Sequence, residues 1–298
     1  MNSPLKQAPG LTDIVLLVTL SALFGVSFMF TEFAVSEIPP LTVSGARVFL
    51  ALLILWPLMK FAGQRLPGFG YIWLPAIASA IFGYALPFAL VSWGQLQVSS
   101  SLAAIFMAIM PLFTIVLAHL FTRDEKLNTW KVAGVVCGLL GVIVLFGADS
   151  LRDLGGPHAM GQLAILGAAV CYAINALITR ALVNTPRLSM LTCLMLIGSA
   201  IMVLASFWFD APFSLNPSWQ AIGALVVLAV GPTATATLMI LVIIKRQGAS
   251  FLSQINFLVP LFGVLLGWLL LDDRLTTSDW IALLIVLTGV ALSHKGNT

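Results

Sequence analysis

The chain has 298 residues, of which 60% are hydrophobic and only 8% are charged, and its formal net charge is +3. A soluble domain carries charge on about a quarter of its residues, so this composition excludes one, and no polar linker divides the chain into a soluble part and an anchor. The basic residues are scattered singly, which excludes a nucleic-acid surface. Long apolar runs with charges between them are typical of a multi-span helical membrane protein.

Ten apolar stretches of membrane-spanning length follow one another along the chain. Short connections separate them, many with Pro, Gly or Asn, such as Pro39-Pro40 and Asn216-Pro217. The first stretch is long and nine others follow, so we interpret it as a helix of the mature protein and not as a cleaved signal. The expected spans cover 12–31, 41–59, 70–93, 98–121, 130–147, 160–182, 188–209, 218–243, 250–271 and 278–294.

The same series of motifs occurs twice. The middle of the chain holds Pro111-Leu112-Phe113, an acidic–basic–Leu corner, a Trp and a Gly-Val pair, and this order returns near the C-terminus about half a chain later. The repeated motifs are Glu125-Lys126-Leu127, Trp130 and Gly141-Val142 in the first copy, and Pro260-Leu261-Phe262, Asp273-Arg274-Leu275, Trp280 and Gly289-Val290 in the second. We therefore expect two repeats, residues 1–148 and 149–298. Five spans is an odd number, so the second repeat is inverted relative to the first.

The distribution of Lys and Arg predicts the orientation of the chain, because cytoplasmic segments are enriched in both. With a cytoplasmic N-terminus, eleven of the fourteen basic residues face the cytoplasm, only Arg152 and Arg274 face outward, and Arg47 lies inside span 2. The eleven are Lys6, Lys60, Arg65, Arg123, Lys126, Lys131, Arg180, Arg187, Lys245, Arg246 and Lys295. All eight Trp lie near predicted span ends, as in an aromatic belt. We expect both termini in the cytoplasm.

Spans 5 and 10 carry almost no polar residues, which indicates peripheral positions. Span 5 has a face of small residues, Gly134, Gly138 and Gly141, that suits close helix contact. This face packs against another helix of the same chain, or it forms a homodimer contact through span 5 or 10. Both interpretations stay open at this stage.

The other eight spans carry polar groups, which are costly in hydrocarbon unless they are paired or face a wet cavity. The candidate lining of a central substrate cavity is Ser27, Thr31, Arg47, Tyr84, Tyr172, Asn175, Thr179, Thr233, Gln254 and Asn256. Each has a simpler role as well. A Thr can bond its own helix one turn back, an Asn or Gln can join two helices, and a Tyr can serve in packing.

Arg47 is the basic residue that lies well inside a span, and Glu32 at the outer end of span 1 is its expected partner. The alternative is that Arg47 extends to the outer interface. Candidate gating or kink positions are those where Pro or Gly interrupts a span, and they are Pro87, Pro111, Gly231, Pro232 and Pro260. The pair Pro111 and Pro260 recurs in both repeats, which favours a transport pathway.

The chain resembles EamA-type members of the drug/metabolite transporter superfamily. The resemblance rests on the Pro of the fourth span, the acidic–basic–Leu corner and the Gly-Val of the fifth span in each half. Arg47 matches an Arg often found in such proteins, whereas the second half has Met195 there, and Phe24-Gly25 replaces a frequent Trp-Gly. The resemblance implies an all-α polytopic membrane protein of ten transmembrane helices arranged as two inverted five-helix repeats.

We expect a carrier of the bacterial inner membrane that exports small metabolites, most similar to the amino-acid exporters, including those for aromatic ones. Exporters of toxic cations or nucleosides, and a non-transporting scaffold or receptor, are the alternatives. No HExxH, GxSxG or mid-span pair of acids occurs, so we expect no catalytic residue, and we assign no metal or cofactor. The mid-span regions lack an acid, which favours facilitated diffusion or weak coupling over proton antiport. The expected partners are the small-molecule substrate and the bilayer, and a homodimer through span 5 or 10 stays open.

Overall fold

The computed structural model describes residues 9–122, 127–152, 156–183 and 185–295. Within these ranges every regular element is a helix, and nine helices are long and apolar enough to cross a membrane. The ninth expected span is divided into α12 (Ala249–Leu252) and the apolar helix α13 (Ile255–Leu270), which is shorter than the others. The expected all-helical membrane fold is thereby confirmed.

The first repeat consists of the following elements in chain order. They are α1 (Leu11–Val35), α2 (Pro40–Phe61), α3 (Trp73–Ala80), η1 (Ile81–Ala85), α4 (Leu86–Gly94), α5 (Ser100–Met107), α6 (Met110–Phe121) and α7 (Thr129–Arg152). The second repeat consists of α8 (Pro157–Ile178), η2 (Thr179–Leu182), α9 (Arg187–Phe209), η3 (Pro212–Ser214), α10 (Trp219–Leu228), η4 (Ala229–Thr235), α11 (Ala236–Arg246), α12, α13 and α14 (Thr277–Lys295).

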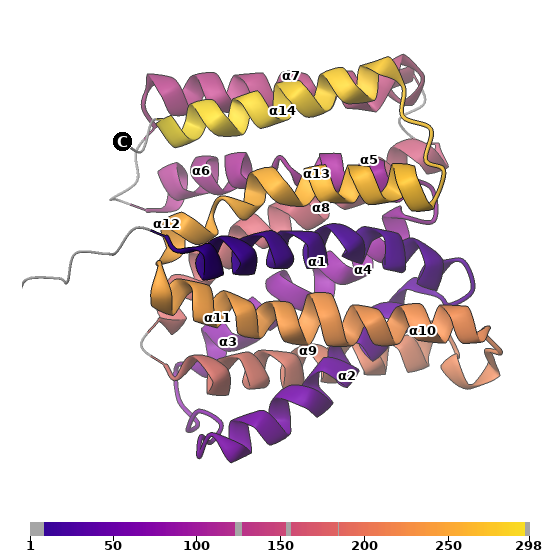
Figure 1. The fold of residues 1–298 in the computed structure, drawn as a ribbon. Coiled ribbons are helices and arrows are strands. Elements are labelled where there is room, and N and C mark those ends of the chain that lie inside the picture. The colour runs from indigo at the N-terminus through magenta and orange to yellow at the C-terminus, as the bar shows by residue number, and fades with distance from the viewer. Residues whose placement is uncertain (1–8, 123–126, 153–155, 184, 296–298) are drawn as a thin grey trace, which may run out of the picture.

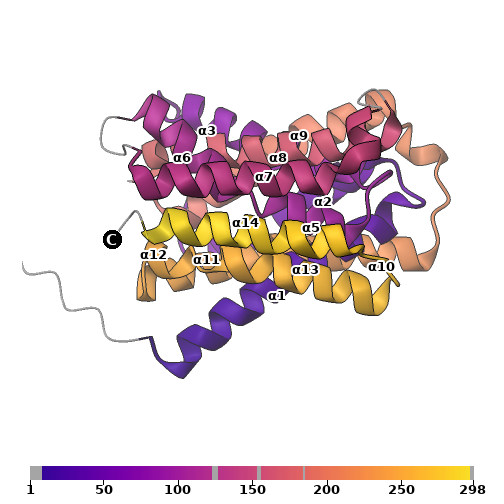
Figure 2. The ribbon, with the colours of Figure 1, turned by 90° about the horizontal axis from the view of Figure 1, so that it is seen from above.

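The helices run roughly side by side along one direction, and α1 begins at the same end of the bundle where α14 finishes (Figure 1). We call this the termini end and the other the opposite end. Helices α5 and α10 begin at the opposite end, whereas α11 finishes at the termini end. The pair α7 and α14 forms one side of the molecule, as both views show (Figures 1 and 2).

Packing follows the inverted symmetry of the repeats. The second helix of each repeat, α2 and α9, pack on one another, and so do the last ones, α7 and α14. The first helix of each repeat packs on the broken fourth span of the other, α1 on α13 and α8 on α5 and α6. The two repeats are therefore interleaved across the whole molecule.

The small-residue face of α7 lies against α14. A Cβ atom built on Gly134 would lie 2.5 Å from the carbonyl oxygen of Gly289, and one built on Gly289 would lie 2.7 Å from that of Gly134. The two backbones thus approach as closely as glycine allows. Of the two expected uses of this face, the structure shows packing within the chain, and a homodimer through α7 or α14 would have to use their outer faces.

Spans 3 and 8 are interrupted at matching places. The π-helix η1 begins at Ile81 and the π-helix η4 begins at Ala229, positions that the 148-residue repeat offset relates. Gly231 and Pro232 lie inside η4, whereas Pro87 is the second residue of α4, directly after η1. A π-helix places one extra residue in a turn and is frequent at functional sites.

Spans 4 and 9 are also broken, but not at equivalent residues. The break between α5 and α6 lies just before Pro111, the second residue of α6. The N–H groups of a first helical turn have no partner within the helix, so a proline there removes no hydrogen bond. The break between α12 and α13 lies at 253–254, so Pro260 sits inside α13, beyond the break. The repeated prolines therefore mark the same two spans but not one shared hinge position.

Candidate substrate-binding site

Arg47 of α2 lies in the interior of the bundle, with 7% of its surface exposed. Its Nε donates to Thr233 Oγ1 at 2.6 Å, its Nη2 lies 3.4 Å from Ser27 Oγ, and its guanidinium carbon is 4.1 Å from the centre of the Phe88 ring. These contacts come from α1, α4 and η4, so both repeats build the site. The alternative that Arg47 extends to the outer interface does not fit this burial.

Thr233 is positioned by the π-helix in which it lies. Its hydroxyl donates to the carbonyl of Leu228, five residues earlier, at 2.8 Å. The single hydroxyl proton is used in this bond, so the oxygen lone pairs are left to accept from Arg47. The irregular turn of η4 thus aims an acceptor at the guanidinium.

The expected ion pair between Glu32 and Arg47 is not formed in the structure, since each side chain has other partners. Glu32 Oε2 accepts from the backbone amide of Ser100 at 2.7 Å, at the first residue of α5. Arg47 meets only neutral oxygens and an aromatic ring among the described residues. The free N–H groups at a helix start attract a carboxylate, which explains the orientation of Glu32.

Three further predicted residues lie close to this centre. Tyr84 and Tyr172 are half-buried, and Tyr172 lies within electrostatic range of both Arg47 and Tyr84. The Tyr84 ring meets Phe88 edge-on, with centroids 6.0 Å apart. Asn175 packs on Gly83 of η1 and accepts from the Ser79 hydroxyl at 2.6 Å, so it joins α8 to α3 at the border of the site.

The other predicted residues lie farther along the spans. Thr31 is buried and donates to the Ser27 carbonyl, while Thr179 is exposed and donates to the Ala176 carbonyl. Both therefore make the local bonds that sequence analysis offered as the simpler role. Gln254 is exposed and Asn256 half-buried at the break between α12 and α13, on the termini end of the bundle.

At the opposite end, carboxylates cap the starts of helices from the other repeat. Asp273 Oδ2 accepts from the Ser101 amide of α5 at 2.9 Å and lies 3.3 Å from Ser100 Oγ. Asp210 accepts from both the amide (2.7 Å) and the hydroxyl (2.9 Å) of Thr42 in the first turn of α2. The acidic position of the second corner motif is thus a helix cap, whereas Glu125 and Lys126 of the first corner lie outside the described residues.

Glu37, in the connection between α1 and α2, caps α10 in the same way. Its carboxylate accepts from the Ser218 amide at 2.6 Å and from the Ser218 hydroxyl at 2.7 Å. These hydrogen bonds hold the pKa of Glu37 below its usual value of 4.5.

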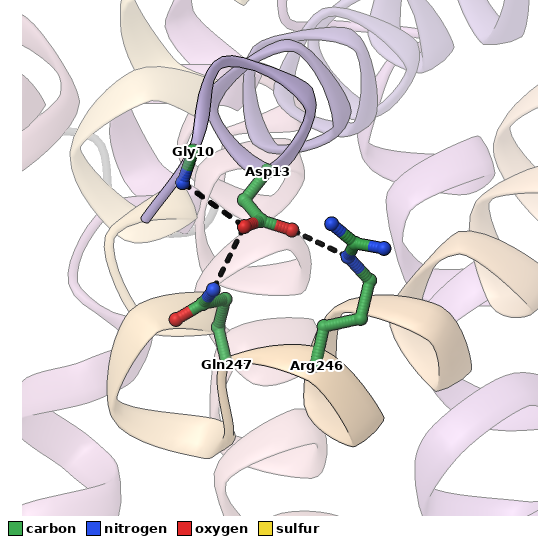
Figure 3. A network of polar contacts seen from close by, with 4 residues as sticks. All are labelled: Gly10, Asp13, Arg246 and Gln247. Atoms are coloured by element: carbon green, nitrogen blue, oxygen red, sulfur yellow. Dashed lines mark hydrogen bonds and ion pairs between the residues drawn. The ribbon is translucent and has the colours of Figure 1, made fainter. Parts of the chain in front are cut away.

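At the termini end, a side-chain network joins α1 to α11 (Figure 3). Asp13 accepts from Arg246 Nε at 2.5 Å, from Gln247 Nε2 at 2.7 Å and from the Gly10 amide at 3.1 Å. Asp13 is buried, with 5% of its side chain exposed, while that of Arg246 is 49% exposed. The start of α9 is capped at this end by an amide oxygen, since Ser189 N donates to Gln64 Oε1 at 3.1 Å.

Sequence analysis missed these end contacts and the ring of Phe88. Asp13 could have been noticed, because it is an acid within a predicted apolar span. Phe88 carries no signal of its own, since a Phe among apolar residues is ordinary. Among the described residues, no group of three His, Cys, Asp or Glu side chains is arranged to hold a metal ion.

Comparison with known proteins identifies the class. The model of the EamA-like transporter family matches the chain twice, over residues 11–147 and 159–294, so the chain belongs to this family. The family consists of transporters and not of enzymes, and the protein is a multi-pass, small-molecule transporter of two inverted five-helix repeats.

Similar curated proteins agree with this class. The chain is 24% identical to the uncharacterized transporter YoaV of Bacillus subtilis, covering 93% of this chain and 94% of the relative. It is 24% identical to the uncharacterized inner membrane transporter YedA of Escherichia coli K12 (94% and 90% covered) and to a probable amino-acid metabolite efflux pump of that strain (95% and 95%). A crystal structure with 19% identity and a TM-score of 0.68, covering 95% of this chain and 96% of the other, shares the fold.

Proposed function

We propose that this transporter exports amino acids or related small metabolites across a bacterial inner membrane by alternating access of its two repeats. The observation that carries the proposal is the buried Arg47, whose contacts come from spans of both repeats. A polar group inside a membrane bundle marks a substrate path by default. The resemblance to a probable amino-acid metabolite efflux pump supports the substrate class.

Alternating access is supported by the contacts at the two ends. Asp13 to Arg246, Ser101 to Asp273, Thr42 to Asp210, Ser189 to Gln64 and Ser218 to Glu37 each join the first repeat to the second. A rocking motion of one repeat against the other must break such contacts at one end while it keeps those at the other. The contacts are side-chain hydrogen bonds, which can form and break without unfolding a helix.

We further propose that the termini end faces the cytoplasm. Among the described residues, this end holds Lys60, Arg65, Arg187, Lys245 and Arg246, as the enrichment of basic residues in cytoplasmic segments requires. Reporter fusions after Lys295 test the orientation. A cytoplasmic fluorescent fusion should fold and fluoresce, and an active periplasmic phosphatase fusion at the same site would contradict the proposal.

The substrate test uses proteoliposomes preloaded with a mixture of all amino acids, followed by mass analysis of the external solution. Selective efflux of a few amino acids, faster than from protein-free vesicles, is the expected result. Efflux equal to that of protein-free vesicles for every amino acid would contradict amino-acid export. The same vesicles loaded with nucleosides and cationic drugs then test the alternative substrates.

A further inference from the structure

We propose that Arg47 is the docking point for a single carboxylate, so that the substrates are monocarboxylates with an apolar or aromatic body. The inference deepens the proposed function and rests on it, because it names the group of the substrate that the central site recognises. Five observations on the described residues carry it, and they concern burial, counter-charge, donor geometry, neighbouring rings and the number of cations.

The first two observations are that Arg47 is buried and that no negatively charged side chain of a described residue pairs with it. Arg47 is 93% buried in the interior of a membrane bundle, yet no carboxylate of a described residue pairs with it. Thr233 and Ser27 offer neutral oxygens, and Phe88 offers the face of its ring. These groups orient a guanidinium and stabilise it in part, but they carry no negative charge. A buried charge of this kind is normally paired.

The third observation is the geometry of the remaining donors. A guanidinium has five N–H groups in a planar fork. Nε is used by Thr233, and Nη2 makes only a long contact of 3.4 Å with Ser27. No hydrogen bond joins Nη1 to a described residue. The two terminal nitrogens therefore present the pair of parallel donors that a planar carboxylate accepts.

The fourth observation is the character of the neighbours. Tyr84 meets Phe88 edge-on, and Tyr172 lies near both Tyr84 and Arg47. Their half-buried rings provide apolar surface for a side chain of the substrate. No acidic side chain of a described residue contacts Arg47, so nothing there recognises an ammonium group by charge.

The fifth observation is that no second basic residue contacts this centre among the residues that the structure describes. The equivalent position of the other repeat is Met195, which is fully buried in an apolar cluster. One guanidinium matches one carboxylate and not a dianion. The carboxylate is therefore the essential group of the substrate, whereas the amino group is dispensable for binding.

Direct binding to the purified full-length transporter in detergent tests this inference independently of export. The probes are three compounds with the same ring, namely phenylalanine, 3-phenylpropionate and phenethylamine, and the aliphatic equivalents leucine, 4-methylpentanoate and isoamylamine. In each series we expect the two carboxylates to bind within about tenfold of one another and the amine at least about 100-fold more weakly, as the loss of charged hydrogen bonds implies.

Variants of Arg47 test whether the preference for a carboxylate depends on this residue. Arg47→Lys keeps the charge but not the fork and should weaken carboxylate binding about tenfold, and Arg47→Gln should weaken it about 100-fold and equalise acid and amine. Arg246→Gln is the matched control, since it removes a guanidinium outside the site and should leave the preference for the carboxylate unchanged. A structural role of Arg47 would instead weaken all probes equally.

The outcomes are distinguishable. Carboxylate-selective binding without export would overturn the proposed function but support the docking site. Export of amino acids with equal binding of acid and amine, or an unchanged preference in Arg47→Gln, would overturn the docking site and leave the function standing. If Arg47→Gln does not fold, the comparison of the unsubstituted protein with Arg47→Lys still tests the docking site. The inference is also overturned if the unsubstituted protein binds none of the six probes.

Discussion

The contacts that join the two repeats differ in chemistry between the two ends of the bundle. At the opposite end, Asp273, Asp210 and Glu37 accept from the backbone amides of helix starts. At the termini end, a charged pair joins Asp13 to Arg246, and an amide oxygen of Gln64 caps α9. Asp210 and Gln64 occupy the same place in the two inverted repeats, each beyond the second helix and capping the start of its counterpart. The same contact thus has a carboxylate at one end and a neutral amide at the other.

This difference indicates which end is harder to open. A carboxylate on backbone amides makes charge-assisted hydrogen bonds with groups that have little other freedom. An ion pair with a half-exposed Arg is screened by water and must order a long side chain. The exposure of polar side chains also indicates that the opposite end is the harder one to open. Thr31 and Ser101 of the opposite end are buried, whereas Thr179 and Gln254 of the termini end are exposed. We therefore expect the opposite end to be the closed end of this structure.

The largest effect is expected for Asp273→Ala, which removes the buried cap of α5. Two donors on Ser100 and Ser101 lose their charged acceptor, so the free energy of unfolding should fall by about 2–3 kcal/mol. Thermal unfolding in detergent measures it. The control is Asp272→Asn, since Asp272 is exposed and has a positive φ that Asn tolerates. Equal stability of the two variants would contradict the cap.

Gly94→Ala tests the tight contact of α4 with α8 at the same end. The new Cβ atom would lie 2.8 Å from the Gly161 carbonyl oxygen and 2.7 Å from Ile165 Cγ1. The helices must separate, so the free energy of unfolding should fall by about 1–3 kcal/mol. Gly223→Ala in α10 is the control, because its Cβ atom meets nothing within 4 Å and Ala favours a helix. A stable Gly94→Ala variant would show that this contact is loose.

A double-mutant cycle of Asp13→Asn and Arg246→Gln measures the ion pair at the termini end. We expect a favourable coupling free energy that is smaller than the loss caused by Asp273→Ala, because the Arg246 side chain is half exposed. Lys245→Gln is the control, since Lys245 is exposed and next in sequence. A coupling larger than the effect of Asp273→Ala would reverse the order of the two ends.

The smallest expected effect is the pH dependence of the Glu37 cap. Its pKa is lower in the folded protein than in the unfolded chain, so its contribution is fully present above the usual value of 4.5 and is lost as the pH falls through the lower folded value. Acid unfolding curves of the unsubstituted protein and Glu37→Gln should therefore differ at neutral pH and converge below pH 4.5. Parallel curves over the whole range would exclude this linkage.

Much of the fold could be predicted from sequence, because hydrophobic length determines a membrane span, the repeated motifs reveal the two repeats, and five spans in each repeat require their inversion. The site was harder to predict. Glu32 and Arg47 lie in adjacent spans, in the half of each that is nearer the opposite end, but the rotation of each helix decides which way its side chain points. That rotation depends on packing partners, which for Glu32 include the start of α5.

The positions of the helix breaks and π-helices were also hard to predict from sequence. Pro260 was a candidate break, yet α13 continues through it and the span divides at 253–254, without a Pro. The π-helices begin at Ile81 and Ala229, before the Pro of each span. The repeated acidic corner carried a signal, but its role as a cap on the other repeat required the structure.

One measurement tests most directly whether the two ends open in turn around Arg47. In a chain whose native Cys137, Cys171 and Cys193 are replaced, Gln254→Cys and Thr31→Cys report on the termini end and the opposite end. Purified protein in detergent is labelled with a polar maleimide, with and without phenylalanine, and Arg47→Gln is the control. We expect phenylalanine to slow labelling at Gln254→Cys, to speed it at Thr31→Cys, and to change neither in Arg47→Gln. Rates that move together, or that respond equally without Arg47, would contradict alternating access around this residue.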